Sequence, residues 1–239
     1  MKDIGGEPTI AILLRRLAKA CRLDDIRVAC SRNSADDPLA EFVQSLGVSV
    51  FRGDEDDALR RFSECAALAK AKVIVRITAN CPLIDSDIVN EVVSVFHDTD
   101  ADYVSNGYKK SFPDGLDVEV FTRESLDLAD GTAENTFLRE HVTPYIHGRR
   151  VGALPTGKFK CEPVVHAGDF SHLRWTLDTA DDLAFLRAIV ARLGPDAGWM
   201  EIVALLSREP TLTNLNAAHG SSESATSGMA KSGHRPSFL

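Results

Sequence analysis

Apolar and polar residues follow two alternating patterns over the first hundred positions of the chain. Short runs of β-branched and other apolar residues predict strands at 26–30, 48–51, 73–77 and 102–106. Between these runs, apolar side chains recur at helical spacing, which predicts helices over 8–21, 37–47, 55–70 and 86–96. Because strands and helices alternate, we expect an α/β fold with a mixed, mostly parallel sheet and helices on both faces. Such a sheet binds ligands at the carboxyl ends of its strands.

The pattern changes after residue 106. The turn signal Pro113-Asp114-Gly115 precedes an alternating stretch, 117–121, that predicts a strand. The elements predicted beyond it are a helix around 134–147, one or two strands between 151 and 166, a strand running into a helix over 174–193, and a last helix near 198–207. Ser86 and Thr179 are the predicted helix caps, and Asp182 has capping-box spacing to Thr179.

These elements extend over residues 1–215, which we interpret as a single domain. Residues 216–239 are rich in Ser, Gly and Ala with scattered charges, and this composition predicts a disordered tail. Neither part contains an internal repeat.

The composition is that of an ordinary globular protein. Of 239 residues, 44% are hydrophobic and 26% are charged, and the formal net charge is -8. That charge argues against a nucleic-acid-binding surface, although a few placed Arg or Lys residues suffice for a small anionic ligand. The sequence contains neither a membrane span, which needs about 18 unbroken apolar residues, nor a signal-peptide pattern. Five scattered cysteines without a CxxC pair predict reduced thiols in a cytoplasmic protein.

Seven stretches of the chain together carry a family resemblance. They are KDIGGEP (2–8), VFRGDEDDALRRF (50–62), VRITANCPLID (75–85), DYVSN (102–106), PDGLDVEVF (113–121), REHVTPYI (139–146) and HLRWTLDTADDL (172–183). In this order they are similar to the cytidylyltransferase family of spore-coat polysaccharide biosynthesis protein F type. That family is related to the enzymes that make CMP-sialic acid and CMP-Kdo. The resemblance covers residues 2–215.

The resemblance implies a Rossmann-like fold of the nucleotide-diphospho-sugar transferase type. It also implies a reaction in which a sugar hydroxyl attacks the α-phosphate of CTP and releases pyrophosphate. In such a reaction Mg²⁺ and basic side chains neutralise the charge of the phosphates. The implied partners are CTP and a small sugar, and the related synthetases indicate a homodimer formed through the 107–165 region.

Two residues of this chain correspond to the metal ligands of the family. Relatives carry an acid in the turn that here reads ANCP, and this chain has Asn80 there. Asp178, after an apolar run, corresponds to the second ligand. An amide oxygen coordinates Mg²⁺ without adding charge, so we expect a weakened site. Alternatively, Asn80 only shapes its turn and Asp178 caps a helix N-terminus.

Arg76 and Asp178 are the catalytic candidates. Arg76 ends a predicted strand, and a guanidinium at the carboxyl edge of the sheet suits a phosphate. A surface salt bridge is the alternative for Arg76. The turn residues Thr78, Ala79 and Asn80 complete the nucleotide-binding set that the resemblance implies.

The substrate-binding candidates lie in three stretches. Asp114, Asp117 and Glu119 alternate along PDGLDVEV, so Asp117 and Glu119 share one face of the predicted strand and could bind sugar hydroxyls. A solvated polar face is the alternative. Arg174 is a further candidate.

The consecutive residues Arg139, Glu140 and His141 lie on a predicted helix, where they cannot all share one face. We therefore expect one of them to meet the ligand, and His141 could instead be a buried, hydrogen-bonded histidine. The acid run GDEDD (53–57) is interpreted as an acid-rich helix N-terminus.

The chain departs from the family at its start. In relatives, a strand and a phosphate-binding loop of the type A-R-x-x-S-x-R-L-P-G-K precede the KDIGG-like stretch, which here begins at residue 2. We therefore expect the first strand to be absent, which would leave two neighbouring strands with unpaired edges. Each unmet buried backbone group costs about 1–3 kcal/mol. The hypothesis that follows is that Met1 is an internal methionine of a longer protein.

Three functions remain open at this point. The first is a cytidylyltransferase of surface polysaccharide biosynthesis that is truncated in this chain. The second is a catalytically inactive relative that acts as a binding or partner subunit, which Asn80 and the missing loop favour. The third is a glycosyltransferase that uses a ready-made nucleotide sugar on the same fold.

Overall fold

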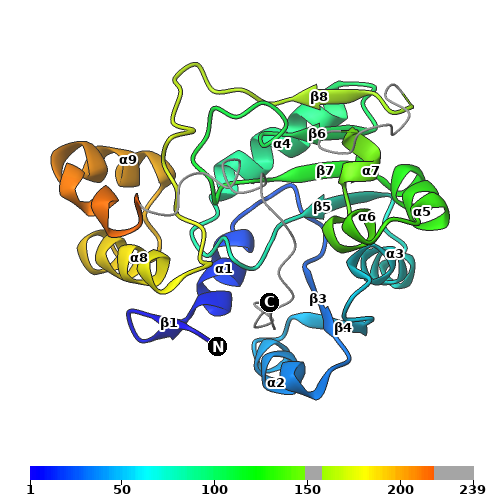
Figure 1. The fold of residues 1–239 in the computed structure, drawn as a ribbon, viewed down its shortest axis with the longest axis horizontal. Coiled ribbons are helices and arrows are strands. Elements are labelled where there is room, and N and C mark those ends of the chain that lie inside the picture. Colours follow the sequence, from blue (N-terminus) through cyan, green and yellow to red (C-terminus); the bar gives the residue numbers. More distant parts are fainter. Residues whose placement is uncertain (149–157, 218–239) are drawn as a thin grey trace.

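The structure is a computed structural model that describes residues 1–148 and 158–217 (Figure 1). Its strands are β1 (Asp3–Ile4), β2 (Glu7–Pro8), β3 (Arg27–Ser31), β4 (Ser49–Gly53), β5 (Val73–Arg76), β6 (Tyr103–Ser105), β7 (Glu119–Thr122) and β8 (Cys161–Pro163). Its α-helices are α1 (Thr9–Leu17), α2 (Asp37–Ser45), α3 (Ala58–Ala69), α4 (Ser86–Asp98), α5 (Arg123–Thr132), α6 (Thr136–His141), α7 (Pro144–His147), α8 (Ala180–Leu193) and α9 (Trp199–Arg208). Two short 3-10 helices are η1 (Ser34–Asp36) and η2 (Pro210–Leu215).

The strands form three separate sheets in the described part of the chain. β1 and β2 make a short antiparallel hairpin, and β3 pairs with β4 in parallel. The main sheet has the order β5-β7-β6-β8, in which β7 is antiparallel to both neighbours and β8 is parallel to β6. The predicted α/β fold with a mixed sheet is confirmed, although β7 makes the main sheet less parallel than expected.

β3 and β5 each keep one edge without a strand partner among the described residues. β3 pairs only with β4, and β5 pairs only with β7. Each of the two strands therefore presents one open edge within the part of the chain that the structure describes. Figure 1 shows β3 and β4 as a pair set apart from the four-stranded sheet.

Helices cover both faces of the main sheet, as the alternating pattern predicts. On one face, α4 contacts β6 and β7 and buries a continuous apolar stripe, made of Ile88, Val89, Val92, Val93 and Phe96. On the other, residues of α3, α5, α6 and α7 form a second core cluster with β5, β6 and β7. The burial of α4 matches the helix predicted over 86–96.

A buried arginine connects α1 to segments that lie much further along the chain. Arg16 of α1 is 4% exposed, and its Nε donates to the carbonyl of Ile84 at 2.6 Å. The same guanidinium donates to the carbonyls of Pro195 and Ala197, both at 2.9 Å. Burial lowers the pKa of Arg16, and the nearby Asp85 opposes that shift. α1 is therefore anchored to the turn after β5 and to the segment before α9.

Some predicted elements differ in the structure. The helix predicted over 134–147 is two short helices, α6 and α7, separated at Val142, whose φ is +71°. Pro144 has no amide hydrogen with which to continue the hydrogen bonds of α6, and it suits the first position of a new helix, α7. Residues 174–177 make only one isolated parallel bridge, between Arg174 and Asp114, rather than a strand.

The predicted strands between 151 and 166 appear as β8 alone, while residues 151–157 lie outside the described residues. Asn216, assigned above to the tail, is 6% exposed and its amide donates to the carbonyl of Arg174 at 3.0 Å. Asn216 is therefore part of the folded domain, and most of the predicted tail lies outside the described residues.

Candidate functional site

The turn after β5 holds two distant segments together. Within the turn, the amide of Cys81 donates to the carbonyl of Thr78 at 3.1 Å. The carbonyl of Asn80 accepts a hydrogen bond from the amide of Leu177 at 2.7 Å. Because this bond fixes the backbone of Leu177, the side chain of Asp178 is placed beside the turn at the carboxyl end of β5.

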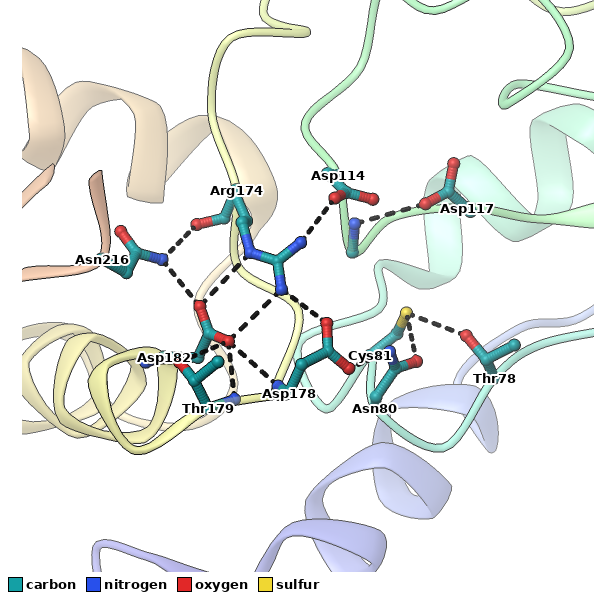
Figure 2. Close-up of polar contacts among 11 residues, drawn as sticks. Thr78, Asn80, Cys81, Asp114, Asp117, Arg174, Asp178, Thr179, Asp182 and Asn216 are labelled. Atoms are coloured by element: carbon teal, nitrogen blue, oxygen red, sulfur yellow. Dashed lines mark hydrogen bonds and ion pairs between the residues drawn. The ribbon is translucent and has the colours of Figure 1, made fainter. Parts of the chain in front are cut away.

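Asn80 and Asp178 meet in this arrangement, although 98 residues separate them in the chain. The amide Nδ2 of Asn80 donates to Oδ1 of Asp178 at 2.8 Å (Figure 2). The Asn80 Oδ1 lies 3.5 Å from the Sγ of Cys81, a thiol that also contacts the Thr78 hydroxyl at 3.2 Å. The Asp178 side chain is 44% exposed, so this pair is open to a ligand.

Arg174 lies at the centre of a group of three carboxylates (Figure 2). Its guanidinium bonds Asp114 at 3.0 Å, Asp182 at 3.3 Å, and Asp178. The Arg174 side chain is only 10% exposed. Planar guanidinium groups suit several carboxylates at once, so Arg174 orients these acids and connects Asp114 to Asp178.

Asp182 is the most buried member of this group and was not among the predicted site residues. It is 0% exposed and completes the predicted capping box of α8 with Thr179. Its Oδ2 also accepts from the amides of Asp178 and Thr179, at 3.0 and 2.9 Å. Burial raises the pKa of Asp182, but the Arg174 hydrogen bond and the two amides outweigh it, so the pKa is lowered. The capping-box spacing was the signal that could have identified it.

Asp117 lies beside Asp114, just before β7. Its Oδ2 accepts from the amide of Gly115 at 3.3 Å. Burial and the neighbouring Asp114 carboxylate raise the pKa of Asp117 to about 7. Gly115 has a φ of +107°, and a Cβ there would meet the amide nitrogen of Thr176 at 2.9 Å. Only glycine therefore fits this turn, which lets the acid pair approach the 174–178 segment.

Glu119 has different neighbours from Asp117. It pairs with Arg76 across β5 and β7, and it accepts from the hydroxyls of Tyr103 at 2.8 Å and Thr143 at 2.6 Å. Burial raises the pKa of Glu119, but Arg76 and these hydroxyls outweigh it, so the pKa is lowered. Arg76 also lies over the ring of Phe62, 5.8 Å from its centre. Arg76 is thus held in a half-buried ion pair, the structural alternative weighed for it above.

The side chain of Arg139 has different surroundings from those of Glu140 and His141, because consecutive residues of a helix lie on different faces. Its guanidinium bonds Asp57 and Asp130, each at under 3 Å, and so connects α6 to α3 and α5. Asp57 is the N-cap of α3, which supports the helix-start interpretation of the acid run. Glu140 and His141 line the same cavity as Asn80 and Asp178. The His141 ring also contacts Phe137, with ring centres 4.4 Å apart.

Comparison with known proteins decides the family. A model of the family described as cytidylyltransferase matches residues 1–157. The chain belongs to the cytidylyltransferase family. It is 34% identical over 214 residues to an uncharacterized protein of Methanocaldococcus jannaschii, covering 89% of this chain and 85% of the relative. It is 29% identical over 217 residues to the spore coat polysaccharide biosynthesis protein SpsF of Bacillus subtilis, covering 88% of each.

Solved structures agree with this assignment. A cytidylyltransferase from Leptospira borgpetersenii superposes with a TM-score of 0.82 at 28% identity, covering 88% of this chain and 87% of that one. A CMP:2-keto-3-deoxy-manno-octonic acid synthetase complexed with CTP shares the fold, with a TM-score of 0.59 at 13% identity over 80% of this chain and 91% of that one. The predicted family and its Rossmann-like nucleotidyltransferase fold are therefore confirmed.

The candidate site of this cytidylyltransferase opens into a cavity of about 940 Å³. β3 and β5 line it, and so do the turn residues Thr78, Ala79 and Asn80. Arg61 and Arg76 also line it, and their buried Nε atoms have no hydrogen-bond partner among the described residues. The cavity thus has largely apolar walls, with charged and polar groups near the Asn80 turn.

The described residues contain neither a clustered metal site nor a membrane-spanning helix. Across 1–148 and 158–217, no three His, Cys, Asp or Glu side chains group closely enough to hold a metal ion. No helix in these ranges is long and apolar enough to cross a membrane.

Proposed function

We propose that this cytidylyltransferase transfers CMP from CTP to a sugar hydroxyl, with release of pyrophosphate, for surface polysaccharide biosynthesis. The observation that carries the proposal is the contact between Asn80 and Asp178 at the carboxyl end of β5. These are the two positions at which the family resemblance implies metal ligands. Ligands of α/β sheets bind at this edge, so the position of the pair supports the proposal.

We propose Mg²⁺ as the cofactor. The donor set fits Mg²⁺, but with one carboxylate fewer than the family resemblance implies. Mg²⁺ is commonly bound by one or two carboxylates together with water and substrate phosphates. Asp178 supplies one exposed carboxylate, and the Asn80 amide supplies a neutral oxygen if it turns over from its present hydrogen bond. When bound there, Mg²⁺ would neutralise charge on the triphosphate. The Arg174 guanidinium would keep Asp178 oriented.

The sugar would lie on the side of the site where Asp114 and Asp117 meet. Asp114 is held by Arg174, which also contacts Asp178, so sugar-side and metal-side groups are physically connected. A carboxyl group with a pKa of about 7, as at Asp117, can donate to and accept from hydroxyl groups near neutral pH. Glu140 and His141 line the cavity and are the candidates for contacts to the nucleotide or sugar from α6.

We infer that the partners are CTP and an acidic or polysaccharide-precursor sugar in the cytoplasm. A homodimer through the 107–165 region is part of the same proposal, and it rests on the family resemblance. Light scattering on the purified chain measures the dimer directly. A molar mass of one chain, 26.0 kDa, at all concentrations tested would contradict it.

Pyrophosphate release tests the proposed reaction. The purified chain is incubated with Mg²⁺, CTP and an acidic sugar such as 2-keto-3-deoxy-manno-octonic acid, with UTP, ATP and GTP as alternative nucleotides. We expect release with CTP only, dependent on the sugar. The variant Asp178→Asn should lower the rate by roughly a hundredfold. The variant Asp196→Asn, in an exposed ion pair with Lys19, is the matched control and should keep the rate.

Two other outcomes would reject the proposal. CTP binding without any pyrophosphate release would favour an inactive relative that acts as a binding subunit, which the neutral Asn80 also favours. Consumption of a ready-made nucleotide sugar without pyrophosphate would identify a glycosyltransferase instead.

A further inference from the structure

Three hydrogen bonds determine where the carboxylate of Asp178 lies. Its Oδ1 accepts from the Asn80 amide at 2.8 Å, and its Oδ2 accepts from the Arg174 guanidinium. Its backbone amide donates to Oδ2 of Asp182 at 3.0 Å. Asp178 stands in a bend just before α8, and its side chain is 44% exposed. The orientation of this carboxylate therefore depends on its hydrogen-bond partners rather than on tight packing.

Asp182 takes part in two of these three contacts. Its Oδ2 accepts from the amide of Asp178, and both of its oxygens accept from Arg174 at 3.3 Å. Asp182 is 0% exposed and is the third residue of α8, so its own position is fixed by the helix and by burial. It thus holds both the backbone of Asp178 and the guanidinium that bonds the Asp178 side chain.

Asn216 holds the same group from the opposite side (Figure 2). Its Nδ2 donates to Oδ1 of Asp182 at 3.2 Å and to the backbone carbonyl of Arg174 at 3.0 Å. Asn216 is 6% exposed and follows η2, which contacts both α8 and α9. An amide nitrogen can donate to a carboxylate and to a carbonyl at once, whereas a carboxylate or an aliphatic side chain cannot. The residue type therefore suits this position.

We propose that Asp182 and Asn216 are positioning residues that hold the carboxylate of Asp178 in the orientation that binds Mg²⁺. They act through the Arg174 guanidinium and through the backbone amide of Asp178. The inference rests on the proposed function, because it takes Asp178 as the metal ligand. Groups that orient a metal ligand commonly change metal affinity by about 10- to 100-fold when they are mutated. The effect matters here because Asn80, the other proposed ligand, brings no charge.

A purely structural role is the alternative, since Asp182 completes the capping box of α8 and Asn216 connects η2 to it. The two roles predict different results. A structural role lowers the stability of the variants but leaves the Mg²⁺ affinity of the folded molecules unchanged. A positioning role lowers the Mg²⁺ affinity of molecules that are fully folded.

Asn216→Ala and Asn214→Ala form a matched pair that separates these roles. Asn214 belongs to η2 and is exposed, so its truncation changes the same 3-10 helix without touching the Arg174 group. Calorimetric titration with Mg²⁺ alone measures metal affinity, and urea denaturation checks that each variant is folded. We expect Asn216→Ala to bind Mg²⁺ about tenfold more weakly than the parent chain, and Asn214→Ala to bind it equally well.

Asp182→Asn gives a second test that keeps part of the cap. Its carbonyl oxygen can still accept from the amides of Asp178 and Thr179, but its new amide nitrogen faces the donors of Arg174 and Asn216. We expect Mg²⁺ affinity to fall by about 10- to 100-fold. Pyrophosphate release from CTP should slow at low Mg²⁺ concentration and recover as the concentration is raised. If Asp182→Asn does not fold, Asn216→Ala decides the question.

The outcomes distinguish this inference from the proposed function. Folded Asn216→Ala that binds Mg²⁺ as tightly as the parent chain would overturn the inference, even if the parent chain releases pyrophosphate. Weakened Mg²⁺ binding in the variants would support the inference even if the parent chain released no pyrophosphate, a result that would reject the proposed reaction alone. A parent chain that does not bind Mg²⁺ would overturn the inference, because Asp178 would then not be a metal ligand.

Discussion

The Arg174 cluster and the β3–β5 cavity are two sides of one candidate site, and they differ in how fully their polar groups are paired. In the cluster, one guanidinium contacts three carboxylates, and the buried Asp182 has several donors. At the cavity, two strand edges and the Nε atoms of Arg61 and Arg76 lack partners among residues 1–148 and 158–217. The comparison teaches that the charged groups of the acidic side are paired with one another, whereas several polar groups at the cavity have no partner within the described residues.

The largest expected effect comes from breaking the completed side. Asp182→Ala would leave Arg174 buried beside one fewer carboxylate and would remove the capping box of α8. We expect the free energy of unfolding to fall by about 3–5 kcal/mol, the usual range for breaking a buried ion pair. Urea denaturation measures it. A loss below about 1 kcal/mol would show that the cluster is not a stabilising unit.

A matched pair of leucines compares packing at the cavity with packing elsewhere in the core. Leu83 is 1% exposed and does not line the cavity, whereas Leu13 is 4% exposed and does. Leu83→Ala should cost about 3 kcal/mol, and Leu13→Ala only about 1–2 kcal/mol, because its cavity side has fewer contacts to lose. Thermal and urea unfolding measure both.

The pair Asp114 and Asp117 should make the free energy of unfolding decrease as the pH rises. Carboxylates in ion pairs have the opposite effect. Because the pKa of Asp117 is raised to about 7, its protonated form is favoured in the folded state. Its stabilising contribution is complete at low pH and is lost as the pH rises through 7. Between pH 5 and 8 we expect this group to lower the free energy of unfolding by about 2 kcal/mol.

Urea denaturation at the two pH values checks this, with Asp117→Asn as the comparison. The variant should lose most of the pH dependence, since its amide does not titrate. An identical pH dependence in both proteins would assign the effect to other groups.

The smallest expected effect concerns the metal. Asn80→Asp would place a second carboxylate beside Asp178, and hard anionic oxygens are the ligands that Mg²⁺ prefers. We expect Mg²⁺ to bind about tenfold more tightly, which corresponds to about 1.4 kcal/mol. Calorimetric titration with Mg²⁺ measures this change, and Asn80→Ala should bind no more tightly than the parent chain. Unchanged affinity in Asn80→Asp would place Asn80 outside the metal site.

The sequence predicts local elements well because their signals lie within a few residues. The apolar spacing over 86–96 became α4, and the capping box of Thr179 and Asp182 is present. The cap of α4 is one residue earlier than predicted, at Asp85 rather than Ser86. A tertiary contact selects it, since the amide of Trp199 donates to Asp85 at 2.9 Å.

The pattern of apolar and polar residues could not predict which side chains from distant segments contact each other. Arg76 was predicted to meet a phosphate or to form a salt bridge, and Arg139 was a candidate for substrate binding. The sequence did not identify their carboxylate partners Glu119 and Asp57, which lie 43 and 82 residues away. Conversely, Asn80 and Asp178 were brought together only through the resemblance to a family, because 98 residues separate them. Spacing within an element reveals which face is buried, but it does not reveal which other element covers that face.

Arg16 also bears on how the protein is made. Its hydrogen bonds to the carbonyls of Ile84, Pro195 and Ala197 span 68, 179 and 181 positions of the chain. Contacts of such long sequence separation form late, because loop closure must precede them. On the ribosome, α1 therefore emerges long before its anchoring carbonyls exist. α4, which packs on α1, is synthesised well before residue 197, so α1 can be partly covered before Arg16 acquires its full set of hydrogen bonds.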